Sequence, residues 1–179
     1  IGQVYSSLYP KNVRRMVFDG TVDPRNIWYQ ANLEQDVAFE KVMQVWFGWL
    51  AKYNSTYRLG STAEEVQERF YAEQGELYKS PADGVIGGSE WTDVFLQAGY
   101  FQFTWTNLAD VFSKWANDQD AAPLVKAYQS VAKVGDDNSY AVYAAVQCTD
   151  TQWPQQWQTW KDDNSRVFPE APFYTWSNA

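Results

Sequence analysis

The chain has 179 residues, of which 45% are hydrophobic and 18% aromatic, so its composition excludes an intrinsically disordered protein and suits one ordinary domain. Its 14 basic and 22 acidic residues give a net charge of -8, which would repel nucleic acids and anionic membranes, and we expect neither as a partner. The chain has no histidine, which excludes a Ser-His-Asp triad or a histidine-containing zinc site built by this chain alone.

The first 24 residues predict the end of a helix followed by a strand. Residues Ile1–Leu8 are typical of the second half of an amphipathic helix, which ends at Tyr9-Pro10. The run from Val13 to Phe18 indicates a buried strand that ends at the turn Asp19-Gly20.

Apolar residues then recur at helical spacing. A long helix is predicted over residues 28–53, and a second begins at a capping box formed by Thr62 and Glu65. A third helix begins near Ser89, and a fourth and a fifth follow it. The apolar positions that define the last three are Trp91, Val94, Phe95, Ala98, Leu108, Val111, Phe112, Trp115, Leu124, Val125, Tyr128 and Val131.

The last forty residues are less regular. The stretch "SYAVYAAVQC" fits a strand or a helix equally well, and its Cys148 is the only cysteine, so no internal disulfide is possible. A short helix is predicted in "WPQQWQTWKDDNSRV", with Pro154 in its first turn. The final "FPEAPFYTWSNA" is expected to be irregular.

Four stretches carry a resemblance to a known family. In this order, "YPKNVRRMVFDGTVDP", "LAKYNSTYRLG", "AVQCTDTQWP" and "APFYTWSNA" resemble the secreted tripeptidyl and proline-type aminopeptidases of actinomycetes. The resemblance implies a mainly α fold, a helical cap with flanking segments of an α/β-hydrolase core. Residues 1–24 would then be a helix end and the core strand after the nucleophile elbow, residues 25–135 the cap, and residues 136–179 a segment returning to the core.

The same resemblance implies a secreted serine exopeptidase whose catalytic serine precedes the position of Ile1 and whose aspartate and histidine follow the position of Ala179. This chain would supply no catalytic residue, metal ligand or cofactor, and alone it should be inactive. Its partners would be a peptide substrate and the remaining chain or chains of the same hydrolase. The family pattern also pairs Cys148 with a cysteine beyond the chain.

An aminopeptidase must bind a free N-terminal ammonium group, and a carboxylate facing the cleft does so through charge-assisted hydrogen bonds. The candidates are Asp150, Glu40, Glu90 and Asp93. Glu40 lies beside an apolar helix face, whereas acids at a helix start favour the helix dipole without any further function.

Other residues allow two interpretations. Asp19 and Asp23 follow the predicted strand, where ligand-facing groups occur in α/β sheets, but turn formation explains them more simply. Aromatic residues either line the substrate cleft or belong to the core, and the sequence alone does not sort Trp91, Tyr100, Phe103 and Trp105.

Two different functions remain open. A free-standing helical module could bind peptides or sugars through exposed aromatic side chains, although a strand at residues 13–18 would have no partner in it. A glycosidase with two catalytic carboxylates needs no histidine, but no pair of carboxylates stands out by its spacing.

Overall fold

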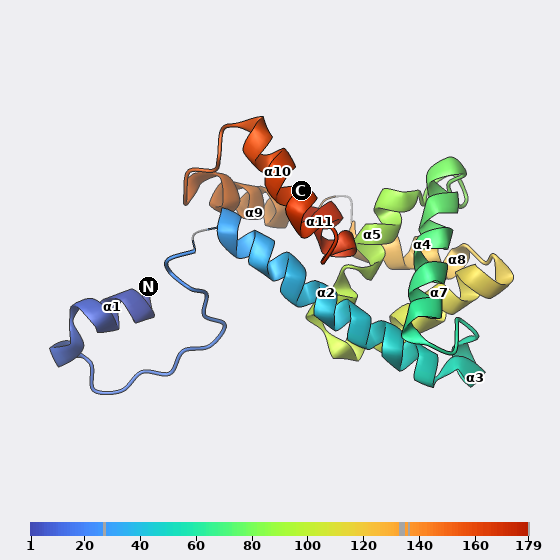
Figure 1. Ribbon diagram of the computed structural model, residues 1–179, viewed down its shortest axis with the longest axis horizontal. Coiled ribbons are helices and arrows are strands. Elements are labelled where there is room, and N and C mark those ends of the chain that lie inside the picture. The colour runs from blue at the N-terminus through green and yellow to red at the C-terminus, as the bar shows by residue number, and fades with distance from the viewer. Residues whose placement is uncertain (27, 133–134, 136, 179) are drawn as a thin grey trace.

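The computed structural model describes residues 1–26, 28–132, 135 and 137–178. Over these residues the fold is helical, and its only β-type pairing is an isolated bridge between Ala82 and Ile86. The mainly α fold class is therefore confirmed. The elements in Figure 1 are α1 (Gly2–Leu8), η1 (Pro10–Asn12), α2 (Tyr29–Lys52), α3 (Asn54–Tyr57), α4 (Ala63–Lys79), α5 (Gly88–Phe95), α6 (Gln97–Tyr100), η2 (Gln102–Thr104), α7 (Trp105–Asp118), α8 (Ala122–Val131), α9 (Asp137–Thr149), α10 (Trp157–Val167) and α11 (Pro172–Asn178).

The long helix α2 runs through the helical body and contacts elements from both halves of the chain. It packs against α4 and α6 and also against α10 and α11 (Figure 1). Its second half buries the face formed by Met43, Trp46, Phe47 and Leu50. Of the apolar positions that predicted the helix, Leu33 and Trp46 are buried, whereas Tyr53 is 40% exposed. The predicted helix over residues 28–53 is confirmed.

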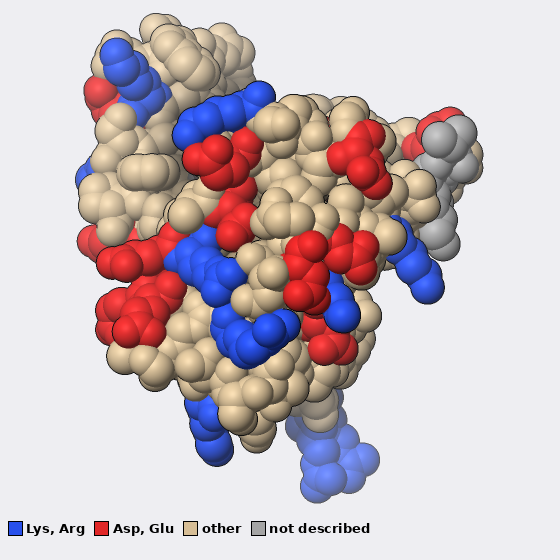
Figure 2. Space-filling view, turned by 90° about the vertical axis from the view of Figure 1, so that its right-hand side faces the viewer, with Lys and Arg blue, Asp and Glu red and all other residues tan. Residues whose placement is uncertain are grey.

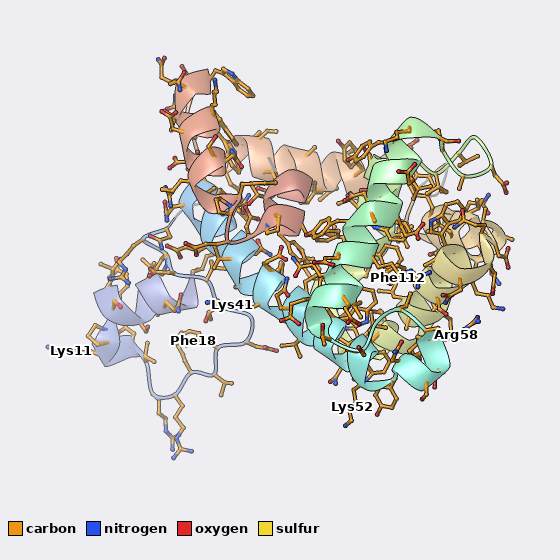
Figure 3. The ribbon with its side chains drawn as sticks, turned by 45° about the vertical axis from the view of Figure 1, so that its right-hand side comes forward. Lys11, Phe18, Lys41, Lys52, Arg58 and Phe112 are labelled. Atoms are coloured by element: carbon orange, nitrogen blue, oxygen red, sulfur yellow. The ribbon has the colours of Figure 1, made fainter. Side chains whose placement is uncertain are left out.

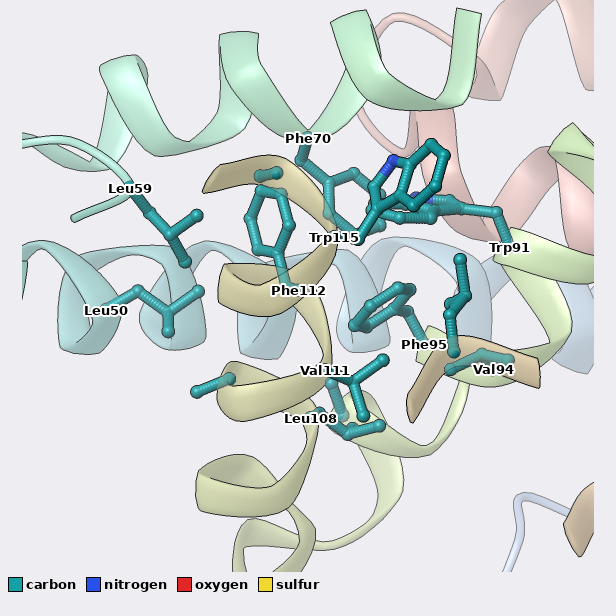
Figure 4. Packing of buried hydrophobic residues seen from close by; sticks show 14 of the residues in the cluster. Leu50, Leu59, Phe70, Trp91, Val94, Phe95, Leu108, Val111, Phe112 and Trp115 are labelled. Carbon is teal, nitrogen blue, oxygen red and sulfur yellow. The ribbon is translucent and has the colours of Figure 1, made fainter. Parts of the chain in front are cut away.

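The core is a cluster of aromatic rings centred on Phe70 of α4. The Phe70 ring lies 5.0 Å from that of Trp91, 5.2 Å from Phe95, 5.5 Å from Phe112 and 5.7 Å from Phe173, measured between centroids. These rings come from α5, α7 and α11, so one side chain joins three helices to α4. Figure 4 shows Phe70 among the rings of Trp91, Phe95 and Phe112. Most of these pairs are tilted or edge-to-face, the geometry that aromatic quadrupoles favour.

The start of α4 follows the predicted capping pattern with one difference. Thr62 Oγ1 accepts the backbone N–H of Glu65 at 3.2 Å, as expected. The Glu65 carboxylate reaches one residue further than predicted and accepts the N–H of Ser61 at 2.6 Å. The helix start is therefore fixed from both sides of Thr62.

The predicted strand over residues 13–18 is not formed. The segment is extended and exposed, and Val17 retains 95% of its accessible surface. A strand needs a neighbouring strand for its backbone hydrogen bonds, and the described residues supply none. Phe18, which Figure 3 shows apart from the helical body, rests its ring against Gly2 of α1.

Two predictions near the end of the chain are corrected, and one ambiguity is resolved. "SYAVYAAVQC" is helical and belongs to α9. Pro154 precedes α10 instead of lying in its first turn, and its carbonyl accepts the Trp160 indole N–H at 2.8 Å. The final segment forms the helix α11, because packing of Phe173 and Tyr174 into the body supplies what local sequence signals lack.

The outer surface mixes charges of both signs. Figure 2 shows acidic and basic side chains interspersed on the face that it presents, in keeping with the moderate negative net charge. Among the described helices, none is both long and apolar enough to cross a membrane.

The position of Phe70 predicts a large loss of stability on truncation. Phe70→Ala should lower the free energy of unfolding by about 3–5 kcal/mol, because it leaves a cavity among four rings. Phe103→Ala is the matched control: that side chain is 81% exposed and its loss should change stability by no more than about 0.5 kcal/mol. Urea unfolding followed by tryptophan fluorescence measures both, and equal losses would contradict this assignment of the core.

Candidate functional site

The four carboxylates predicted to bind substrate do not form one cluster. Glu40 lies on α2, Glu90 and Asp93 share α5, and Asp150 directly follows α9. Their role in substrate binding stays a prediction. Their local bonds differ, however, and show which of them already have a structural partner.

Glu40 is buried, with 2% of its surface exposed, and links α2 to α11. One carboxylate oxygen accepts the Phe173 backbone N–H at 3.1 Å, and the other accepts the Gln44 amide at 3.3 Å. Burial raises the pKa of Glu40, and these hydrogen bonds partly oppose the shift. The buried Asp36, one turn earlier, raises the pKa of Glu40 further through its charge.

The two acids of α5 have different surroundings. The Glu90 carboxylate accepts the Gly87 N–H at 2.9 Å and so caps its own helix. Asp93 points outward, and its pKa is raised by partial desolvation and then by the neighbouring charge of Glu90. Asp93 therefore has no capping role of that kind.

Asp150 and Cys148 both lie at the exposed end of α9. The backbone N–H of Asp150 donates to the Val146 carbonyl oxygen at 3.1 Å. The Asp150 side chain is exposed. Cys148 is a free, exposed thiol in this structure, so it is not the buried side chain that a lone cysteine usually is. Its pairing with a cysteine outside the chain stays a prediction.

A cavity of about 610 Å³ lies between the segment before α2 and the first half of that helix. We call it the α2 cavity. The described residues that line it include two carboxylates and three side-chain amides: Val22, Asp23, Pro24, Asn26, Trp28, Ala31, Asn32, Glu34, Gln35 and Ala38. It is large enough for part of a peptide and has polar groups to orient one.

The two carboxylates of the α2 cavity differ in charge balance. Arg25 bonds Asp23 through its Nε at 2.9 Å, and this hydrogen bond lowers the pKa of Asp23 to about 2. Glu34 is held only by neutral amides, those of Asn26 at 2.9 Å and Gln30 at 3.2 Å. No ion pair among the described residues includes Glu34, so its negative charge is oriented but not compensated.

The structure also sorts the four ambiguous aromatic residues. Trp91 and Trp105 are buried in the core, whereas Tyr100 and Phe103 are exposed at the turn between α6 and α7. The Tyr100 hydroxyl accepts the amide N–H of Gln35 at 3.4 Å, and Gln35 lines the α2 cavity. An exposed aromatic turn therefore adjoins that cavity.

The sequence did not predict that Glu34 and this aromatic turn lie beside the same cavity. The sequence contained one usable signal, the spacing of Gln30 and Glu34, which places an amide and a carboxylate on one helix face. Asp23, previously interpreted as a turn residue, both lines the cavity and forms the local bond to Arg25. In the described part of the chain, no group of three acidic, histidine or cysteine side chains is arranged to hold a metal ion.

Comparisons with known proteins give a clear relationship. No protein-family model matches the chain. Two curated proteins, each named tripeptidyl aminopeptidase, from Streptomyces lividans and Streptomyces coelicolor, are each 42% identical to it over 185 aligned residues. The alignments cover 100% of this chain and 34% of each relative.

The chain resembles one third of a tripeptidyl aminopeptidase. The family resemblance noted in the sequence is thereby confirmed for the whole length of the chain. The chain spans about a third of the length of these tripeptidyl aminopeptidases.

The buried carboxylate of Glu40 predicts a pH-dependent stability. Its pKa in the folded chain is raised, so the stability it contributes is full below the pKa of an unfolded glutamate and is lost as the pH rises through the folded pKa. Between about pH 4 and pH 7 the free energy of unfolding of the native chain should therefore fall relative to that of Glu40→Gln. Denaturant unfolding at several pH values measures this difference.

The exposed Glu68→Gln in the middle of α4 is the matched control for that series. Its difference from the native chain should stay constant over the same range. A pH-independent difference for Glu40→Gln would contradict the effect assigned to burial.

Proposed function

We propose that this chain is the cap-containing portion of a secreted serine exopeptidase of the α/β-hydrolase fold that releases short N-terminal peptides. The observation that carries the proposal is the 42% identity, over the whole chain, to a third of two tripeptidyl aminopeptidases. In such an enzyme a serine activated by histidine attacks the peptide carbonyl, and water then releases the acyl group. The chain has no histidine, so the other parts of the enzyme would supply this chemistry.

The cap in this proposal selects the substrate and controls its access to the serine. The α2 cavity receives the N-terminal end of the peptide, and the exposed Tyr100 and Phe103 contact its apolar side chains. Glu34 accepts the N-terminal ammonium, because its carboxylate is oriented by amides and is in no ion pair with another described residue.

Asp150 and Asp93 are the alternative ammonium ligands, since both carboxylates are exposed. Glu40 and Glu90 are weaker candidates because each already accepts a backbone N–H. The remaining chain of the hydrolase and a peptide substrate are the proposed partners.

A second candidate function is a free-standing module that binds peptides or sugars. It is favoured by the exposed stacked pair Phe101 and Phe103, whose ring centroids lie 5.1 Å apart. Saturable binding of a sugar by residues 1–179 alone would support this alternative over the peptidase.

The proposed function predicts activity in a chimera and none in the isolated chain. The matched third of the Streptomyces lividans tripeptidyl aminopeptidase is replaced by residues 1–179, and release of p-nitroaniline from a tripeptide p-nitroanilide is followed. We expect the chimera to be active and the chain alone to match the buffer blank. Hydrolysis by the chain alone, or a folded chimera without activity, would count against the proposal.

Within the active chimera, Glu34→Gln tests recognition of the ammonium group. We expect KM for the free-amine substrate to rise about tenfold with little change in kcat, because a charge-assisted hydrogen bond is lost. The N-acetylated substrate should be unaffected, and the exposed Glu64→Gln should leave both substrates unchanged. An unchanged KM in Glu34→Gln would contradict ammonium binding by Glu34. The same substitution at Asp150 or Asp93, to Asn, would then identify the ammonium ligand.

The secreted location and the external partner of Cys148 are also proposals. In the chimera, Cys148 should resist iodoacetamide under denaturing conditions until a reductant is added, whereas in the isolated chain the exposed thiol should react directly. Peptide mass spectrometry reports both states. Direct alkylation in the chimera would rule out the disulfide.

A further inference from the structure

A second cavity, of about 380 Å³, lies between α4 and the start of α11. We call it the α4–α11 cavity. Three of its walls, Tyr71, Gln74 and Tyr78, lie on one face of α4, and the others are Phe168, Pro172 and Phe173. None of these residues lines the α2 cavity, so the two sites are distinct.

Among the described residues, four of the six walls of the α4–α11 cavity are aromatic. Phe173 is anchored in the core, 5.7 Å from Phe70 between ring centroids. Tyr78 packs its ring against Gly88 so closely that a Cβ there would lie 2.3 Å from it, which fixes the position of this wall. Such rigid aromatic walls suit a flat ring in offset or edge contact.

One polar group in the α4–α11 cavity is both fixed and available. Gln74 is only 8% exposed, and its amide nitrogen donates to Gly88 O at 3.0 Å and to Thr92 Oγ1 at 2.9 Å. These two bonds set the orientation of the amide and leave its carbonyl oxygen without a partner among the described residues. An accessible carbonyl oxygen without a partner, in a largely apolar cavity, favours a ligand that brings one hydrogen-bond donor.

Tyr71 adds a second unsatisfied group. Its hydroxyl oxygen is buried and has no hydrogen-bond partner among the described residues. Burial, and then the charge of Glu40, keep its pKa above the usual range, so the hydroxyl is neutral. The Tyr71 hydroxyl therefore lies inside the protein and not on the cavity surface. The described walls of the cavity are aromatic or apolar except for the Gln74 amide, and none of them is charged.

We propose that the α4–α11 cavity is a binding site for a planar aromatic group that carries one N–H donor, with Gln74 Oε1 as its acceptor. The volume lies at the lower end of the range for small-molecule sites, about 300–1,000 Å³, which suits a bicyclic ring. The inference does not depend on the proposed peptidase function, because the site is separate from the α2 cavity and needs no catalytic residue.

The test uses 5-fluoroindole as the probe and fluorine NMR of the probe titrated with residues 1–179. We expect saturable binding with a Kd below about 1 mM. The donor is tested on the ligand, because substitution of Gln74 would also break its bonds to Gly88 and Thr92. 1-Methyl-5-fluoroindole, which lacks the N–H, should bind about fivefold more weakly.

Two half-exposed walls test the location. Phe168→Ala should weaken binding by at least about threefold without shifting thermal unfolding, because its side chain is half-exposed. Tyr78→Ala should weaken binding to a similar extent and also lower the unfolding temperature, because its ring packs against Gly88. Phe103→Ala, an exposed aromatic residue outside this cavity, is the matched control and should bind as the native chain does.

No saturable binding, or equal binding of the methylated probe, would overturn the proposal. Equal losses in Phe103→Ala and Phe168→Ala would also overturn it, since the probe would then bind elsewhere.

Discussion

The contact between the buried Glu40 carboxylate and the start of α11 is the constraint on which the arrangement of the chain depends. It joins residues 133 positions apart in the sequence. Burying a carboxylate is unfavourable unless hydrogen bonds compensate it, and the Phe173 N–H and the Gln44 amide do so here. A helix end whose N–H groups would otherwise be unsatisfied gains the same bond.

Once α11 is held by Glu40, its aromatic side chains complete two other parts of the body. Phe173 reaches the Phe70 cluster and also forms a wall of the α4–α11 cavity. The Tyr174 hydroxyl donates to Leu96 O at 2.9 Å and lies so close to Gly99 that any Cβ there would clash. The C-terminal helix therefore fixes α4 and α6 through a single pair of residues, which is why packing, and not local sequence, makes this segment helical.

The same physical distinction explains which features the sequence could predict. The helices α2, α4, α5, α7 and α8 were predictable because amphipathic spacing is a local property of the chain. The segment 13–18 was not, because a strand depends on a neighbour that the described residues do not provide. The four aromatic residues could not be sorted for a related reason: Trp91 and Phe103 look alike in sequence, and only tertiary packing separates a 0% exposed core ring from an exposed one.

The candidate site shows the limits of ranking acids by their apolar neighbours. That criterion selected Glu40, which proved to be buried, as the pattern indicated, but bonded to the protein itself. The sequence does not distinguish Glu34 as a ligand-binding residue, because an exposed glutamate on a helix usually contacts only solvent. Its orientation depends on Asn26, which lies in the segment before α2 and reaches Glu34 only after the chain has folded back along the helix. No spacing rule includes that contact.

Helix α2 divides its length between a half packed in the core and a half that borders the α2 cavity. Its second half buries Met43, Trp46 and Phe47 in the core, while its first half presents Glu34 and Gln35 to the α2 cavity. Most surface substitutions change stability by about 0.5 kcal/mol or less, so residues that border the cavity can be substituted without loss of the fold. The packed second half of α2 holds the helix in position, and the cavity residues of its first half therefore keep their placement whatever their side chains contribute to stability.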